Sequence, residues 1–168
     1  LYLSWLNILT IFTSLNLYYG VFNKAMVKYE RDRERYISSM QGLIIVLCGM
    51  SFLLYLIFQH RFNNLLELNT SIVCMMFLEM LMMPAIQFWM SKKRFEYDYR
   101  PIVKVSLLKS LLNPGLGIIF VMLFEHKAEA RIFAIVLVET IIGMVVLIKQ
   151  FKKGKCFYVK EYWLYAVK

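Results

Sequence analysis

The sequence lacks the residue patterns on which catalytic and metal sites depend. It contains only two histidines, His60 and His126, and three cysteines, Cys48, Cys74 and Cys156. The cysteines form no Cys-x-x-Cys pair and no Cys/His spacing, so neither a zinc site nor a disulfide framework is indicated. Zinc-protease, phosphate-loop, dinucleotide-binding and serine-hydrolase motifs are also missing. We therefore expect no metal, no cofactor and no enzyme with a catalytic site of the soluble type.

Charge is scarce as well. Only 18% of the 168 residues are charged and 60% are hydrophobic, and the mean hydropathy is +0.58. Soluble chains are typically about 25% charged and about 45–50% apolar. A soluble domain of this length would need more polar surface to cover its core, so the composition predicts an integral membrane protein.

The apolar residues form five runs that predict membrane-spanning helices. Each run is close to the roughly 17–25 residues that cross a hydrocarbon core of about 30 Å. Barrel strands would alternate over about ten residues, and no such alternation is present. We therefore predict an all-α fold, a polytopic transmembrane helix bundle in a single domain over residues 1–168. Its spans are expected at about 1–22, 42–58, 65–90, 101–124 and 132–148.

The connecting segments differ sharply in charge. Segments 23–41, 91–100 and 149–168 carry net charges of +2, +2 and +5, which account for the whole formal charge of +9. Lys and Arg accumulate on the cytoplasmic side of membrane proteins. We therefore expect these three segments in the cytoplasm, short loops 59–64 and 125–131 outside, the Leu1 end external and the Lys168 end cytoplasmic. Basic residues divided among loops do not form the contiguous face of a nucleic-acid binder, so membrane lipids are the expected surroundings.

Aromatic residues gather near the basic ends of the predicted spans. Trp and Tyr are enriched at both membrane–water interfaces, so this grouping predicts an interfacial belt. The belt comprises Tyr18, Tyr19, Phe88, Trp89, Phe95, Tyr97, Tyr99, Tyr158, Tyr162 and Trp163.

Charged residues inside the spans are the candidate functional residues. Glu79, Lys109 and Glu139 lie near the middle of the third, fourth and fifth runs. A charge at mid-bilayer costs about 2.5–3.5 kcal/mol on insertion scales, so such residues normally face a bundle interior or a watery cavity. They either line a cavity for a substrate head group or coupling ion, or form a structural pair of Lys109 with one glutamate. For the glutamates both interpretations stay open.

The fourth run is interrupted by the sequence Asn113-Pro114-Gly115. Proline removes a backbone donor, so this sequence predicts a kink or break near mid-membrane. Broken helices at this depth often mark transporter binding sites. For Pro114 alone, an ordinary proline kink is favoured, since proline and glycine are frequent in membrane helices. Lys109 lies four residues before Asn113, on the same helical face, which favours the cavity for these two residues. The candidate substrate-binding set is therefore Lys109, Asn113, Glu79 and Glu139.

Several longer motifs resemble one transporter family. The run SLNLYYGVFNKAMVKYERDRERYISSMQGL resembles the second helix and following cytoplasmic loop of Wzx-type polysaccharide flippases. FWMSKKRFEYDYRPIVKVSLLKSLLNPGLGIIFVML, EARIFAIVLVE and GKCFYVKEYWLYAVK are similar to that family in order and spacing. The chain starts within an apolar stretch at Leu1 and ends just after an aromatic run, so we expect a piece of a longer polypeptide.

The resemblance implies a fold and a function. It implies a MATE-like exporter of the bacterial cytoplasmic membrane, built from two pseudo-symmetric halves, with the five runs as helices two to six of the first half. It implies flipping of an undecaprenyl-pyrophosphate-linked oligosaccharide from the cytoplasmic to the periplasmic leaflet. The implied partners are this lipid-linked substrate, a coupling ion (H⁺ or Na⁺) at the glutamates, and polysaccharide polymerase machinery. A lysine in the cavity would compensate the pyrophosphate charge.

Three alternatives remain open. Another MATE-like exporter would share the topology but differ in its cavity, although the RFEYDYR segment and the aromatic-basic end favour the polysaccharide branch. A membrane-embedded sugar transferase would need clustered acidic or histidine residues at a membrane face, and this sequence lacks such a cluster. An inactive remnant is the third alternative.

Overall fold

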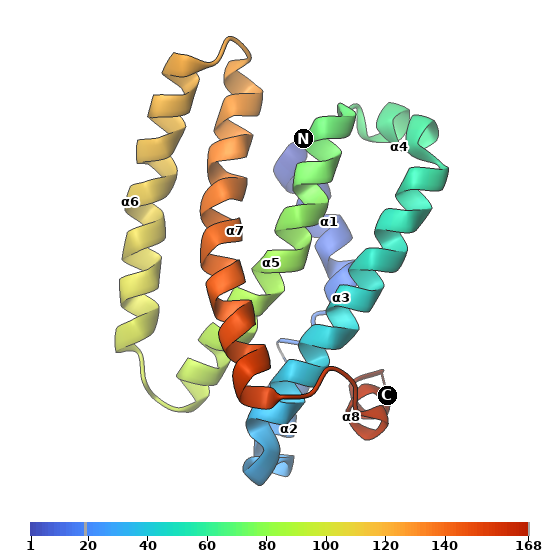
Figure 1. The fold of residues 1–168 in the computed structure, drawn as a ribbon, viewed down its shortest axis with the longest axis vertical. Helices are drawn as coiled ribbons and strands as arrows, with labels where there is room; N and C mark the ends of the chain where they lie inside the picture. The colour runs from blue at the N-terminus through green and yellow to red at the C-terminus, as the bar shows by residue number, and fades with distance from the viewer. Residues whose placement is uncertain (19, 168) are drawn as a thin grey trace.

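A computed structural model describes residues 1–18 and 20–167, and within them it contains helices and no strand. This confirms the predicted all-α fold (Figure 1). Tyr19 and Lys168, named above, lie outside the described residues. The elements are α1 (Tyr2–Ser14), α2 (Gly20–Lys28), the 3₁₀ turn η1 (Glu30–Asp32), α3 (Arg33–Ile57), α4 (Gln59–Leu66), α5 (Thr70–Phe95), α6 (Arg100–Leu123), α7 (Lys127–Gly154) and α8 (Lys160–Val167).

Among the residues that the structure describes, four helices are long and apolar enough to cross a membrane. Helices α3, α5, α6 and α7 contain 25, 26, 24 and 28 residues, which correspond to about 36–42 Å at 1.5 Å per residue. These lengths exceed a hydrocarbon core of about 30 Å. The four helices cover four of the five predicted spans, and they agree with a multi-pass membrane protein.

The first predicted span is divided between two shorter helices. Helix α1 has 13 residues, about 20 Å, and α2 begins at Gly20. Leu15 and Asn16 adopt the left-handed conformation with φ of 48° and 49°, and the Asn16 amide donates a hydrogen bond to Ser14 Oγ over 3.3 Å. Serine and asparagine side chains offer the backbone alternatives to helical hydrogen bonds, which accounts for the turn inside an apolar run.

The three basic segments lie at one end of the bundle. Figure 1 shows α2, the α5–α6 connection and α8 together at the bottom of the view, and α4 with the α6–α7 connection at the top. We call the first the basic end and the second the opposite end. This arrangement was predicted, because spans joined alternately by basic segments and by short loops place all the basic segments at the same end.

The long helices continue past the predicted spans into the basic segments. Helix α3 begins at Arg33 rather than near residue 42, and α7 extends to Gly154 rather than residue 148. Helix α5 ends with three basic residues in its last turn, and α7 has two. Cations near a helix C-terminus interact favourably with the helix dipole, so charge marks the end of the apolar run but does not end the helix.

Helix α7 is held close to its neighbours by glycines. A Cβ added at Gly143 would lie 2.7 Å from the Cβ of Met82 on α5, and one added at Gly154 would lie 2.3 Å from the Cβ of Ser38 on α3. Small residues at such positions allow membrane helices to pack backbone to backbone. Helix α7 therefore forms the centre of the bundle, between α5, α6 and α3.

Part of the predicted aromatic belt is instead core. Tyr18, Phe88 and Tyr162 are buried in one hydrophobic cluster at the basic end, whereas Tyr97 is 82% exposed. Tyr162 is covered because α8 folds back onto α3, where the Trp163 indole N–H donates to the Ser39 carbonyl over 2.9 Å. The Phe88 ring packs against the rings of Tyr18 and Phe22, with centroids 6.1 and 5.7 Å apart. A sequence that marks an interface does not show which of its rings are covered by a returning helix.

Candidate functional site

Lys109 and Glu139 form an ion pair between α6 and α7. The Lys109 Nζ lies 2.5 Å from Glu139 Oε1, and the two side chains are 25% and 11% exposed. The second carboxylate oxygen, Glu139 Oε2, is buried and accepts no hydrogen bond from any described residue. Of the two partners that the sequence left open for Lys109, the structure places Glu139 in direct contact.

Glu79 lies beside this pair and has a partner of its own. The Tyr2 hydroxyl donates a hydrogen bond to Glu79 Oε2 over 2.7 Å, joining α1 to α5. Glu79 is 5% exposed, and its carboxylate interacts electrostatically with Glu139 and Lys109. The structure therefore brings together all three charges that the sequence singled out. Tyr2 was missed, because a tyrosine in an apolar run gives no signal of its partner.

Asn113 lies apart from the ion pair, on a groove between α6 and α7. Its Oδ1 atom is buried and has no hydrogen-bond partner among the described residues. The groove has a volume of about 470 Å³, and its lining also includes Pro114, Gly117, Arg131 and Ile135. Within the described residues Arg131 forms no ion pair. Arg131 was not among the predicted site residues, because residues 125–131 were expected to form a loop, whereas α7 begins at Lys127.

Of the kink or break predicted near Pro114, the break is not found, and the kink stays a prediction. Helix α6 is continuous from Arg100 to Leu123, with Pro114 inside it. Only Gly117 of this helix is buried, since α6 packs chiefly against α7. The charged cluster thus lies along the seam between a peripheral helix and the centre of the bundle, on unbroken helices.

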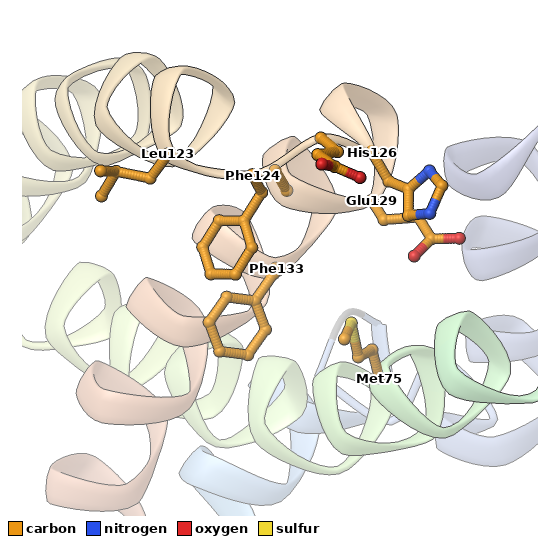
Figure 2. Close-up of a pocket in the computed structure, with 8 residues that line it drawn as sticks. Met75, Leu123, Phe124, His126, Glu129 and Phe133 are labelled. Carbon is orange, nitrogen blue, oxygen red and sulfur yellow. The ribbon is translucent and has the colours of Figure 1, made fainter.

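A further cavity lies at the opposite end, beside the α6–α7 connection. Figure 2 shows Phe124 and Phe133 on one side of it and Met75 of α5 on another. Its volume is about 500 Å³, and Glu129 in its wall accepts a hydrogen bond from Asn69 Nδ2 over 3.1 Å. His126 also lines it, but no three His, Cys, Asp or Glu side chains of the described residues converge to hold a metal ion. The cavity is an apolar recess with a polar rim.

No family model, no curated protein and no solved structure matches the chain. The resemblance to Wzx-type flippases therefore stays a prediction from sequence motifs. The function has to be argued from the site itself, because a fold alone does not determine one.

The cluster and the groove suit different ligands. If all three groups are ionised, Glu79, Glu139 and Lys109 carry one positive and two negative charges, so the cluster has an excess of one negative charge. The charge on Lys109 is already compensated by Glu139, and a second carboxylate nearby favours a cation or a proton. The groove instead presents the unpaired cation of Arg131 and the amide of Asn113, a combination that suits an anion bearing hydroxyl groups.

Proposed function

We propose that the chain is part of a membrane transporter that flips an undecaprenyl-pyrophosphate-linked oligosaccharide across the bacterial cytoplasmic membrane, within a MATE-like two-half fold. The observation that carries the proposal is the charged cluster of Glu79, Lys109 and Glu139 inside three membrane-length helices. Ionisable groups at this depth mark substrate and ion pathways. A sugar chain needs such a polar path, because transfer of its unpaired hydroxyls into hydrocarbon is costly.

In this proposal the groove and the cluster have separate roles. Arg131 compensates the pyrophosphate, and Asn113 exchanges hydrogen bonds with sugar hydroxyls; both line the groove of about 470 Å³ between α6 and α7. Glu79 and Glu139 hold the coupling ion, H⁺ or Na⁺, and Lys109 limits their mutual repulsion. Lys109 thus acts through the glutamates rather than by contact with the pyrophosphate.

The sidedness follows from the charge distribution. The basic end, with its net charges of +2, +2 and +5, is assigned to the cytoplasm because Lys and Arg are retained there during insertion. Substrate then enters from the leaflet at the basic end and leaves at the opposite end. Polysaccharide polymerase machinery on the outer side is the expected consumer of the product.

The proposal is tested by deletion of the complete coding region from which the chain derives. The deletion strain should lose surface polysaccharide and accumulate the finished lipid-linked unit, and the wild-type gene should restore export. Arg131→Gln should reduce export at a normal membrane level on immunoblots, because the substrate anion loses its unpaired cation. Lys127→Gln is the matched control, since Lys127 is an exposed cation on the same helix outside the groove.

Other outcomes would identify other functions. Unchanged surface polysaccharide with raised drug sensitivity would contradict the proposal and favour another MATE-like exporter. An incomplete rather than a finished lipid-linked unit would favour a sugar transferase. A deletion without any effect on these properties would leave an inactive remnant.

A further inference from the structure

A third cavity lies at the basic end, far along the helices from the charged cluster. It has a volume of about 340 Å³ and lies among the start of α3 and the ends of α5 and α7, which Figure 1 shows side by side. Its lining residues are Glu34, Ile37, Trp89, Lys92, Lys93, Glu96, Val146, Lys149, Gln150 and Lys153. The proposed transport cycle assigns it no role.

Two of the four lysines are already compensated. Lys92 pairs with Glu34 and, over 3.5 Å, with Glu96. Lys93 pairs with Glu96 over 3.1 Å and with Asp98 over 2.8 Å. These pairs join α3 to α5 and tie the end of α5 to the connection that follows it. They leave little positive charge on this side of the cavity.

The other two lysines are free to bind an anion. Lys149 and Lys153 are exposed and lie four residues apart on α7, on one helical face. Within the described part of the chain neither forms an ion pair. With four lysines and two glutamates in its lining, the cavity has a formal net charge of +2, and that excess corresponds to the two unpaired ammonium groups.

Gln150 adds a second, independent indication of a ligand. It is 6% exposed, and its Nε2 donates a hydrogen bond to the Ala85 carbonyl over 3.0 Å. Its Oε1 is buried and accepts no hydrogen bond from the described residues. A buried acceptor without a partner is unfavourable. Because Gln150 lines the cavity, a shift of its side chain would let a ligand hydroxyl satisfy the Oε1 atom.

We propose that this cavity binds a phosphate group with hydroxyls beside it, as in the headgroup of an anionic phospholipid whose phosphate is linked to glycerol. Lys149 and Lys153 contact the phosphate, and Gln150 Oε1 accepts a hydrogen bond from a headgroup hydroxyl. Ile37, Val146 and Trp89 supply an apolar wall beside the charged groups, which suits a lipid at the edge of the hydrocarbon core. Basic pockets between membrane helices are known to bind anionic headgroups.

The test is native mass spectrometry of the purified chain in detergent. The purified protein is titrated separately with phosphatidylglycerol, with inorganic phosphate and with phosphatidylcholine, which has no net charge. Phosphatidylglycerol should bind more tightly than phosphatidylcholine. Lys149→Gln and Lys153→Gln should each weaken its binding about fivefold, equivalent to about 1 kcal/mol per lysine. Lys152→Gln should leave it unchanged, because Lys152 is an exposed neighbour outside the cavity.

The phosphate arm distinguishes the source of the ligand. If inorganic phosphate does not displace phosphatidylglycerol, the cavity is a lipid site. If inorganic phosphate displaces it in a manner that depends on Lys149 and Lys153, the cavity is a site for phosphate itself. Both outcomes support the proposal. Equal affinities of the wild type, Lys149→Gln and Lys153→Gln would overturn it, as would an equal loss in Lys152→Gln. Lys153→Arg, which keeps the charge, should retain binding and so excludes a general loss of fold.

Discussion

The pairing of Lys109 with Glu139 predicts a specific pattern of stability. Lys109→Met removes the ammonium group and leaves Glu139, whose side chain is 11% exposed, without its partner. Lys104→Met is the matched control, because Lys104 is an exposed lysine on the same helix, outside any ion pair of the described residues. Only the first substitution should destabilise the protein strongly.

The magnitude follows from the geometry. Two unit charges separated by 2.5 Å attract by about 7 kcal/mol at an effective dielectric constant of about 20. Much of this attraction offsets the desolvation of the two groups, so removal of one partner costs about 3–5 kcal/mol. Replacing both charges removes the desolvation penalty as well, and such replacements are often neutral or stabilising. The double variant Lys109→Met/Glu139→Gln should therefore regain most of the stability.

The assay is unfolding by SDS titration in mixed micelles, followed by circular dichroism, with membrane levels measured by immunoblot. A Lys109→Met variant that is no more destabilised than Lys104→Met would refute a stabilising role of the ion pair. Rescue of Lys109→Met by Glu79→Gln as well as by Glu139→Gln would also refute this role, because Glu79 already has a hydrogen bond from Tyr2. A rescued double variant that is stable but no longer exports would show that the pair serves transport as well as folding.

Three further predictions use other parts of the molecule. Gly143→Ala should lower stability by about 1–3 kcal/mol, because the added Cβ would lie 2.7 Å from Met82 Cβ. Gly49→Ala should raise stability by about 0.5–1 kcal/mol, because there is open space around its Cβ. Equal effects of the two substitutions in the SDS titration would contradict this prediction. Single cysteines are introduced into a variant whose native cysteines are replaced by alanine, at Arg61 and Lys127 of the opposite end and at Glu30 and Tyr97 of the basic end. An impermeant thiol reagent should label the opposite end in intact cells and the basic end only after lysis. The reverse pattern would invert the topology. Burial acts to raise the pKa of Glu96, but Lys93 and Lys92 outweigh it and hold the pKa below its ordinary value. The stabilisation by Glu96 is therefore present above the unfolded pKa of about 4.3 and lost as pH falls through the lower folded value, so an acid titration of Glu96→Gln should lack this component.

The long helices were predictable because membrane insertion depends on local composition. The apolar runs of α5 and α6 are each nearly continuous, and the structure places helices within a few residues of them. Helix ends were less predictable, since the lysines that close an apolar run are also good helix formers. The turn at Leu15–Asn16 was not predictable from hydropathy, because leucine continues the apolar run in which it occurs.

The candidate site was only partly accessible from the sequence. Glu79, Lys109 and Glu139 could be singled out because each is costly at mid-membrane. Which glutamate pairs with Lys109 depends on the rotation of α7 against α6, and the hydrogen bond from Tyr2 depends on where α1 meets α5; both are tertiary properties. Lys149 and Lys153 gave only a topological signal, because nothing in their local sequence shows that they share a cavity with Gln150.

The peripheral position of α6 has a consequence for biosynthesis. Helix α6 carries Lys104 and Lys109, and a lysine near mid-membrane costs about 2.5–3.5 kcal/mol on insertion scales. Its compensating carboxylate, Glu139, lies on α7 and leaves the ribosome later. We therefore expect α6 to be retained at the translocon until α7 has been synthesised, so that the two helices partition into lipid together as a hairpin.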